Sequence, residues 1–266
     1  MYAPTAPRAR DVIADLSARG RYHFKSAELR AALGVSAAAA RQALSRLAAK
    51  GAVASPARGF YVIVPPEYRR IGCLPAEQFV PALMEFRRVR YYAALLSAAQ
   101  YHGAAHHRPQ AFQVMLGRNR PAISCGAVRV SFVARRNVCD VPVRTFNTPR
   151  GTVLVSTVEA TAFDLVGYMH RAGGVDRVAA LLSELDEEMD PARLVEAAKS
   201  ASTPWAQRLG YLLERVGAGD KAELLKEHVR NQACNFAKLL PAASADNVPR
   251  SPDWRLYVNA NIETEP

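Results

Sequence analysis

The histidine cluster YHGAAHHRP spaces two imidazoles as a metal site on a helix would. His102 and His106 are four residues apart, so both side chains would lie on one face of a helix. Gly103 and Pro109 indicate that the helix ends here, and no H-E-x-x-H carboxylate accompanies the pair. We therefore expect no metal, and interpret these residues as partly exposed histidines at a helix end.

Carboxylates are too sparse for a nuclease in the part of the chain where a sheet is expected. Residues 71–155 contain only Glu77, Glu85 and Asp140, whereas metal-dependent cleavage of DNA needs several converging acidic side chains. The acidic run ELDEEMD, residues 184–190, is interpreted as a solvated helix end. No G-x-S-x-G, P-loop or G-x-G-x-x-G motif occurs. We expect neither catalytic residues nor a cofactor.

The four cysteines are scattered and form no C-x-x-C pair. This excludes a zinc ribbon or a dithiol redox motif of the usual spacing and predicts buried or idle thiols at Cys73, Cys125, Cys139 and Cys234. The sequence also contains no apolar run of membrane-spanning length and no signal-peptide pattern at its start. We therefore expect a cytoplasmic protein without a membrane partner.

Polar side chains follow one face of a predicted helix in GVSAAAARQALSRLAAKG. Ser36 is the expected N-cap, and the inward positions are Val35, Ala40, Ala43, Leu44 and Leu47. Arg41, Gln42, Ser45 and Arg46 lie on the opposite face. Glutamine can bond adenine through two hydrogen bonds, and arginine can bond guanine or a phosphate. Because residues 37–40 are all alanine, we expect sparse base reading and modest sequence selectivity.

The elements around this helix predict a winged helix-turn-helix in residues 1–66. A helix before Gly20, an extended piece over residues 21–25 and a short helix capped by Ser26 and closed by Gly34 precede it. Two strands, residues 53–55 and 60–64, follow it and form the wing. We expect Lys25, Ser36, Ser45 and Arg46 to contact the DNA backbone, and Arg58 at the wing tip to enter the minor groove.

The charge distribution supports a polyanion partner for the front of the chain. Residues 1–70 carry 12 Lys and Arg against 4 Asp and Glu, residues 71–155 carry 11 against 3, and residues 156–266 carry 12 against 17. Clustered cations increase the affinity for a nucleic acid because they displace counterions from its phosphates. This balance favours DNA binding over a winged helix that serves only protein interaction.

A second basic group, EFRRVRYY, has two interpretations. Arg87, Arg88 and Arg90 can extend the nucleic-acid contact, or they can be the solvated face of a helix whose tyrosines are buried. The sequence favours the solvated face and leaves the additional contact open.

The rest of the chain, residues 71–266, predicts a larger mixed α/β domain and hence an α+β protein. Two helices are expected before Gly103, and strands at residues 111–116, 128–133, 141–146 and 153–155 are expected to form a small sheet, which places the sheet-containing part at about 71–155. The helical part, about 156–266, should contain four helices, starting at a Ser156–Glu159 capping box, at Asp190, at Thr203 and after Asp220. The last segment, DWRLYVNANIE, alternates as a strand that returns to the sheet.

Several segments together resemble the AbiEi family of antitoxins from type IV toxin–antitoxin systems. They are GVSAAAARQALSRLAAKG, RGFYVIVPPEYR, YYAALLSAAQYHG, TVLVSTVEATAFDLVGY and the terminal WRLYVNA, and the resemblance covers essentially the full length. Ser36, Arg41, Gln42, Ser45 and Arg46 match the family's DNA-binding motif, whereas the alanine-rich start of that helix departs from it.

The resemblance implies a DNA-binding transcriptional autorepressor that acts on operator inverted repeats in double-stranded DNA. It also implies a functional partner, a nucleotidyltransferase-like toxin encoded in the same operon, that is counteracted without a stable complex. Antitoxicity would reside in the C-terminal domain. The residues themselves leave two alternatives: a one-component regulator whose C-terminal domain senses a small ligand, and a nuclease delivered by its winged helix.

Overall fold

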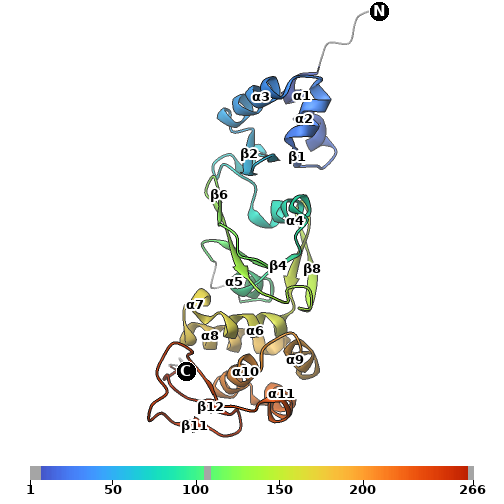
Figure 1. The fold of residues 1–266 in the computed structure, drawn as a ribbon. Helices are drawn as coiled ribbons and strands as arrows, with labels where there is room; N and C mark the ends of the chain where they lie inside the picture. The colour runs from blue at the N-terminus through green and yellow to red at the C-terminus, as the bar shows by residue number, and fades with distance from the viewer. Residues whose placement is uncertain (1–6, 105–108, 263–266) are drawn as a thin grey trace, which may run out of the picture. The chain divides into compact units, whose positions relative to one another are not determined.

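The front of the chain folds as three helices and a three-stranded sheet in this computed structural model, which describes residues 7–104 and 109–262 (Figure 1). The elements are α1 (Ala9–Ala18), β1 (His23–Lys25), α2 (Ser26–Leu33), α3 (Ala37–Ala49), β2 (Val53–Ala57) and β3 (Phe60–Ile63). The strand order is β1-β3-β2, and both pairs are antiparallel. The predicted order of helices and wing is confirmed.

The turn between α2 and α3 follows from two residues that the sequence singles out. Gly34 ends α2 in the left-handed region at φ 64°, a conformation that costs glycine little. The Ser36 hydroxyl accepts a hydrogen bond from the Ala39 amide at 3.2 Å and so caps α3. Two details were wrong. Ser26 is the first residue of α2 and makes no capping hydrogen bond, and Val35 is exposed because it lies in the turn before α3.

Both faces of β3 are buried, each in a different hydrophobic cluster. Ile63 packs with Ile13, Phe24 and the α3 leucines inside the winged helix. Phe60 and Val62 point the other way, because side chains alternate along a strand, and pack with residues of α4 (Ala76–Arg87) such as Phe79. This double burial explains why the segment FYVIV is apolar throughout rather than alternating.

The chain divides into two compact units, and the first contains residues 1–91, 110–134 and 145–153. Besides the winged helix, it holds a short 3₁₀ turn (Pro66–Tyr68), α4, β5 (Phe112–Leu116), β6 (Ile123–Cys125) and β7 (Val128–Ala134). The three strands lie in the order β6-β7-β5. The β5–β7 pair is parallel and the β6–β7 pair is antiparallel. The sequence predicts β5 and β7 but not the three-residue β6.

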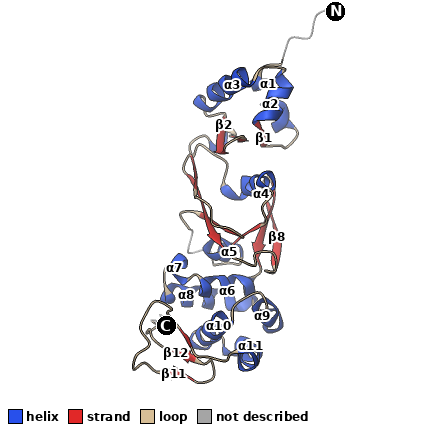
Figure 2. Cartoon of the chain, in the orientation of Figure 1, coloured by secondary structure: helices blue, strands red, loops and turns tan. Residues whose placement is uncertain are grey.

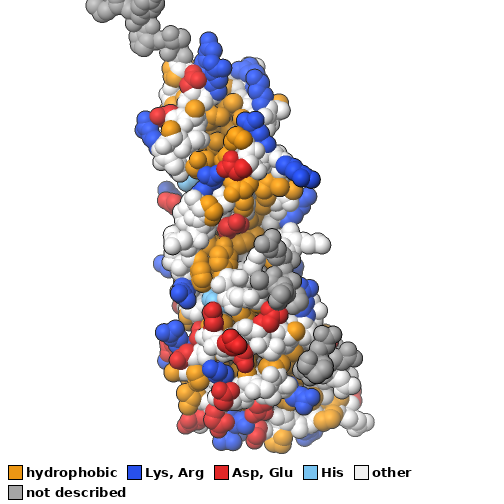
Figure 3. Space-filling view, turned by 180° about the vertical axis from the view of Figure 1, so that it is seen from behind, with side chains coloured by type: hydrophobic (Ala, Val, Ile, Leu, Met, Phe, Trp, Pro, Cys, Tyr) orange, Lys and Arg blue, Asp and Glu red, His pale blue; other side chains and the backbone are white. Residues whose placement is uncertain are grey.

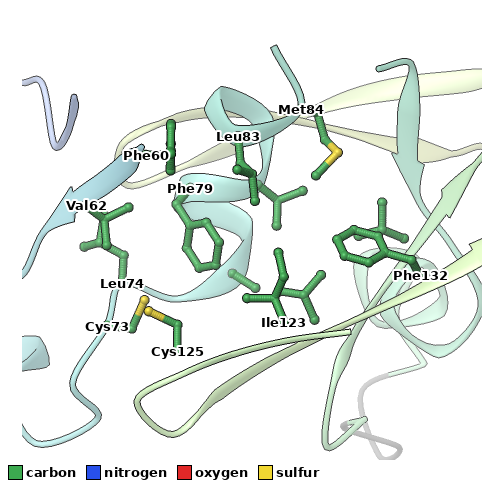
Figure 4. Packing of buried hydrophobic residues seen from close by; sticks show 14 of the residues in the cluster. Phe60, Val62, Cys73, Leu74, Phe79, Leu83, Met84, Ile123, Cys125 and Phe132 are labelled. Atoms are coloured by element: carbon green, nitrogen blue, oxygen red, sulfur yellow. The ribbon is translucent and has the colours of Figure 1, made fainter. Parts of the chain in front are cut away.

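Two cysteines that are far apart in sequence meet in the core of this first unit. Figure 4 shows the sulfur atoms of Cys73 and Cys125 side by side below Phe79. Their mutual hydrogen bond, together with burial, raises the pKa of Cys73, and the same bond lowers the pKa of Cys125. The two other thiols, Cys139 and Cys234, are exposed. Burial, one of the two predicted states, is therefore found for Cys73 and Cys125, and the spacing does not reveal that these two meet.

Helices are the main secondary structure in the described part of the second unit, which comprises residues 92–109, 135–144 and 154–266 (Figure 2). Strand β9 (Gly151–Ser156) lies between β4 (Tyr91–Ala93) and β8 (Val143–Thr148), and pairs parallel with β4 at Ala93 and Val155. The helices are α5 (Leu95–Tyr101), α6 (Val158–Gly167), α7 (Met169–Ala172), α8 (Val175–Leu185), α9 (Pro191–Ala198), α10 (Thr203–Arg215) and α11 (Gly219–Gln232), with a 3₁₀ turn at Asp186–Glu188. None of the described helices is both long and apolar enough to span a membrane.

Three expectations for the helical part are corrected. Thr157, not Ser156, caps α6, and Glu159 is buried and accepts a hydrogen bond from the Asp190 amide instead of closing a capping box. Ser202 rather than Thr203 precedes α10. The described region also contains α7 and α8 in addition to the four predicted helices, because Gly173 and Gly174 adopt positive φ and separate two helices there. The cap at Asp190 is confirmed, with its carboxylate 2.9 Å from the Arg193 amide.

A buried ion pair lies at the centre of the second unit. The guanidinium of Arg135 contacts the carboxylate of Asp164, and the Tyr92 hydroxyl donates to the same carboxylate at 3.0 Å. Arg135 also donates to the Ser200 carbonyl at 2.8 Å and lies 5.3 Å from the Trp205 ring. Complete burial raises the pKa of Asp164 to about 6, against the opposing effect of Arg135. The network thus joins β4, α6 and the segment before α10.

The end of the chain forms a small separate sheet, which corrects the expectation that it returns to the strands before it. Its strands are β10 (Ala237–Lys238), β11 (Arg250–Ser251) and β12 (Leu256–Tyr257), in the order β10-β12-β11. Trp254 is completely buried beneath this sheet against α10. The fit is so close that a Cβ atom on Gly210 would lie 2.0 Å from the indole ring. Glycine at this helical position therefore has a packing role.

Candidate nucleic-acid interface

The predicted polar face of α3 is fully presented to solvent. Arg41, Gln42, Ser45 and Arg46 are exposed, whereas Ala40, Ala43, Leu44 and Leu47 on the opposite face are buried. The apolar face fixes the helix against the winged-helix core, so the polar face projects outward, as a helix that enters the major groove must. The structure brings these four predicted residues together on one surface.

A shallow hollow between α2 and α3 adds an arginine that the sequence reasoning missed. The hollow has a volume of about 210 Å³, and Arg30 and Arg41 both line it. Two guanidinium groups at the edge of one concavity favour an anion, because each offers planar donors that match phosphate oxygens. The exposed position of Arg30 on the first helix of the helix-turn-helix was the available signal, since that helix crosses the DNA backbone in such motifs.

The wing places Arg58 at the tip of its hairpin. Arg58 is exposed, and Gly59 beside it has φ 80°, so the chain can reverse tightly. The Ser55 hydroxyl donates to the Ala57 and Phe60 carbonyls at 3.0 and 3.1 Å and holds the turn. The tip is therefore built as a short, braced loop that carries one cation.

Lys25 lies apart from the α3 face, in a second hollow of about 500 Å³ within the first unit. Its ammonium group is 5.9 Å from the centre of the Phe86 ring. Arg88 lines the same hollow, so the structure brings together one residue from each predicted basic group. Glu28 and Glu85 also line it, and the local charge is therefore mixed.

The EFRRVRYY arginines differ in environment. Arg88 and Arg90 are exposed, whereas Arg87 is half-buried, with its guanidinium 6.0 Å from the Phe132 ring. Burial and the neighbouring Arg120 lower the pKa of Arg87. Arg120 was missed because it follows β5, more than thirty residues along the chain, and only the tertiary fold brings it near.

Acidic side chains gather elsewhere. On the face drawn in Figure 3, Asp and Glu side chains cluster over the helical second unit. This agrees with the excess of 17 acidic over 12 basic residues in 156–266. Electrostatic attraction of a polyanion is therefore concentrated on the first unit.

Only one of the two clustered histidines, His102, lies in the part of the chain that the structure describes. His102 is buried, not partly exposed as expected, and its Nε2 lies 2.7 Å from the Ser156 carbonyl oxygen. Its Nδ1 lies 3.7 Å from a Glu188 carboxylate oxygen. His106 lies outside the described residues. Within residues 7–104 and 109–262, no group of three or more His, Cys, Asp or Glu side chains is arranged to hold a metal.

Among solved structures, this chain is similar to the crystal structure of RV2827C protein from Mycobacterium tuberculosis. The TM-score is 0.64 at 17% sequence identity, and the match covers 94% of this chain and 92% of that one. At this identity the likeness concerns the fold. None of the curated proteins searched matches the chain.

Two family models match the chain, one in its N-terminal part and one in its C-terminal part. Residues 11–64 match the model "Transcriptional regulator, AbiEi antitoxin", which covers the winged helix and its exposed α3 face. Residues 92–215 match the model "AbiEi antitoxin C-terminal domain", which ends with α10. The chain belongs to the AbiEi family and is a DNA-binding regulator of the antitoxin type.

Proposed function

We propose that this chain is the transcriptional autorepressor and antitoxin of a type IV toxin–antitoxin pair. Residues 1–66 bind inverted repeats in the operator of its own operon. Residues 71–266 counteract a nucleotidyltransferase-like toxin without forming a stable complex with it, and the protein acts in the cytoplasm. No step in this function requires catalysis by the chain.

The observation that carries the proposal is the exposed α3 face on a basic winged helix. Arg41 and Gln42 occupy its most useful positions for base edges, and Arg46 and Ser45 lie beside them for phosphates. Ser36 orients the start of the helix, and Lys25 and Arg58 are proposed as further contacts outside the α3 face. Arg87, Arg88 and Arg90 are proposed as an additional backbone contact, with Arg120 near Arg87.

The test is growth of cells that express the adjacent reading frame, with this protein or with its Arg41→Ala, Gln42→Ala variant. We expect the neighbour to be toxic and both forms of the protein to restore growth. Only the wild type should retard promoter DNA in a gel, because each lost bidentate base contact costs about 1–3 kcal/mol. Repression and antitoxicity would then reside in different parts of the chain.

A matched control removes the same residue types from the acidic second unit. Arg193 and Gln232 are both exposed there, so Arg193→Ala, Gln232→Ala should leave promoter binding unchanged. A harmless neighbour would overturn the antitoxin proposal and leave a ligand-responsive regulator as the better account. Undiminished DNA binding by the α3 variant would overturn the assigned interface.

We also predict that promoter affinity depends steeply on salt. Lys25, Arg41, Arg46 and Arg58 would neutralise about four phosphates, which corresponds to a slope of about −3.6 in log affinity against log salt concentration. Binding should therefore weaken roughly a hundredfold between about 50 and about 200 mM salt. Fluorescence anisotropy with a labelled promoter duplex measures this, and a flat affinity over that range would contradict it.

A further inference from the structure

The outer face of the terminal three-stranded sheet carries aromatic rings and cations in one row. Lys238 pairs with Tyr257 across the β10–β12 ladder, and Arg250 pairs with Tyr257 across β11–β12. Paired residues of neighbouring strands point to the same side of a sheet. Leu256, which precedes Tyr257 in β12, is completely buried. Because successive side chains of a strand point to opposite faces, the row of Lys238, Tyr257 and Arg250 faces outward.

The aromatic rings of this face form a cluster with one guanidinium, in which the two rings are tilted by 49° to each other. The rings of Phe236 and Tyr257 lie with centroids 5.3 Å apart. The guanidinium carbon of Arg250 is 5.7 Å from the first ring and 5.1 Å from the second. Phe236 nevertheless keeps 38% of its surface exposed, so its ring retains area that a planar ligand can cover.

The face is held in place from beneath, by α10. Gln207 donates to the carbonyls of Asn235 and Arg255 at 2.9 and 2.8 Å, and Arg208 donates to the Lys238 carbonyl at 2.7 Å. These bonds fix the backbone on both sides of the aromatic pair. The rings are therefore preorganised rather than loose on a terminal segment.

The charges on this face select an anionic ligand. Its row contains no carboxylate and two cations, Arg250 and Lys238, of which the Lys238 ammonium also donates to the Ala243 carbonyl at 3.0 Å. Residues 156–266 as a whole, by contrast, carry more acidic than basic side chains. Two described acidic residues near these strands in sequence have partners of their own: the Asp253 carboxylate accepts from the Lys226 ammonium at 3.2 Å, and that of Asp246 from the Ser244 hydroxyl at 2.6 Å. Exposed rings for bases beside cations for phosphates are what single-stranded nucleic acid requires.

We propose that Phe236, Tyr257, Arg250 and Lys238 form a binding site for a single-stranded nucleic acid, with an unpaired base stacked on Phe236. The site is separate from the α3 face and lies outside both matched segments, residues 11–64 and 92–215. It does not depend on the toxin or on operator binding. Duplexes should bind poorly here, because their bases are stacked on one another and unavailable to a protein ring.

The experiment measures binding of a fluorescein-labelled 12-nucleotide oligouridylate to the full chain carrying Arg41→Ala and Gln42→Ala, which removes the α3 contact. Adding Phe236→Ala and Arg250→Ala should weaken binding about tenfold or more. Leu224→Ala with Arg230→Ala is the matched control, because it removes an exposed apolar side chain and an exposed arginine from α11. That pair should change the affinity less than about twofold.

Two further variants separate stacking from general surface loss. Phe236→Tyr keeps a ring and should retain binding, whereas Phe236→Leu keeps apolar area without a ring and should lose it. Ultraviolet cross-linking of the oligouridylate should map to Phe236 or Tyr257. Equal binding by the ring-deleted and control variants would overturn the site. Loss of antitoxicity in the ring-deleted variant with unchanged RNA binding would also overturn it and assign the face to a protein partner.

Discussion

Replacing Asp164 with alanine is expected to lower the free energy of unfolding by about 3–5 kcal/mol. Asp164 is completely buried and faces the equally buried guanidinium of Arg135. Removing the carboxylate leaves this cation in the interior without its counter-charge, and also leaves the Tyr92 hydroxyl without its acceptor. Urea denaturation followed by circular dichroism measures the loss.

The double variant Arg135→Met, Asp164→Leu tests whether the uncompensated charge is the cause. It removes both charges and fills much of the space with apolar atoms, so it should be more stable than Asp164→Ala alone. The single variants Arg135→Met and Asp164→Leu complete a double-mutant cycle, which isolates the coupling between the two side chains. If Asp164→Ala lowers the free energy of unfolding by less than about 1 kcal/mol, the Arg135 charge does not depend on this carboxylate for compensation, and the prediction is contradicted.

Replacing Trp254 with alanine is expected to destabilise the second unit by about 3–5 kcal/mol. The indole is completely buried and packs directly on Gly210 of α10, so its removal leaves a large cavity beneath the terminal sheet. Trp254→Phe should cost less because most of the ring volume is kept. Thermal unfolding followed by circular dichroism at helical wavelengths measures both.

Gly210, which packs against Trp254, offers an independent check of this contact. Gly210→Ala places a methyl group where the Trp254 ring already lies, so it should also destabilise the fold, by about 1–3 kcal/mol. Gly219→Ala is the matched control, because a Cβ atom there would meet only Glu214 at ordinary van der Waals distance. Equal stability of these two variants would contradict the described packing.

The sequence predicts the winged helix well because its signals are local. Gly34 and Ser36 determine the turn and the helix start through their own backbone and hydroxyl groups, without help from distant residues. The terminal strand was misplaced for the opposite reason. The alternation around Leu256 shows that one face is buried, but only the tertiary fold decides that the covering element is α10.

In the candidate interface, too, some features follow from local sequence signals and others only from the tertiary fold. The face of α3 could be predicted because helical periodicity separates Arg41 and Gln42 from the buried leucines. Arg120 could not be placed, since only contacts between elements bring it near Arg87. Arg30 lies on a predicted helix, but the hollow that it shares with Arg41 also depends on contacts between elements. The meeting of Cys73 and Cys125 is invisible to any spacing rule for the same reason.

The two buried faces of β3 constrain how such regulators can recombine. A foreign winged helix joined at residue 66 would have to bring its own counterparts of Phe60 and Val62, or leave a gap against Phe79. Exposed side chains such as Arg41 and Gln42 do not have to fit against this cluster. The DNA sequence preference can therefore change through point substitutions on the exposed face. The exchange of a whole winged helix is limited instead by buried apolar side chains that do not contact DNA.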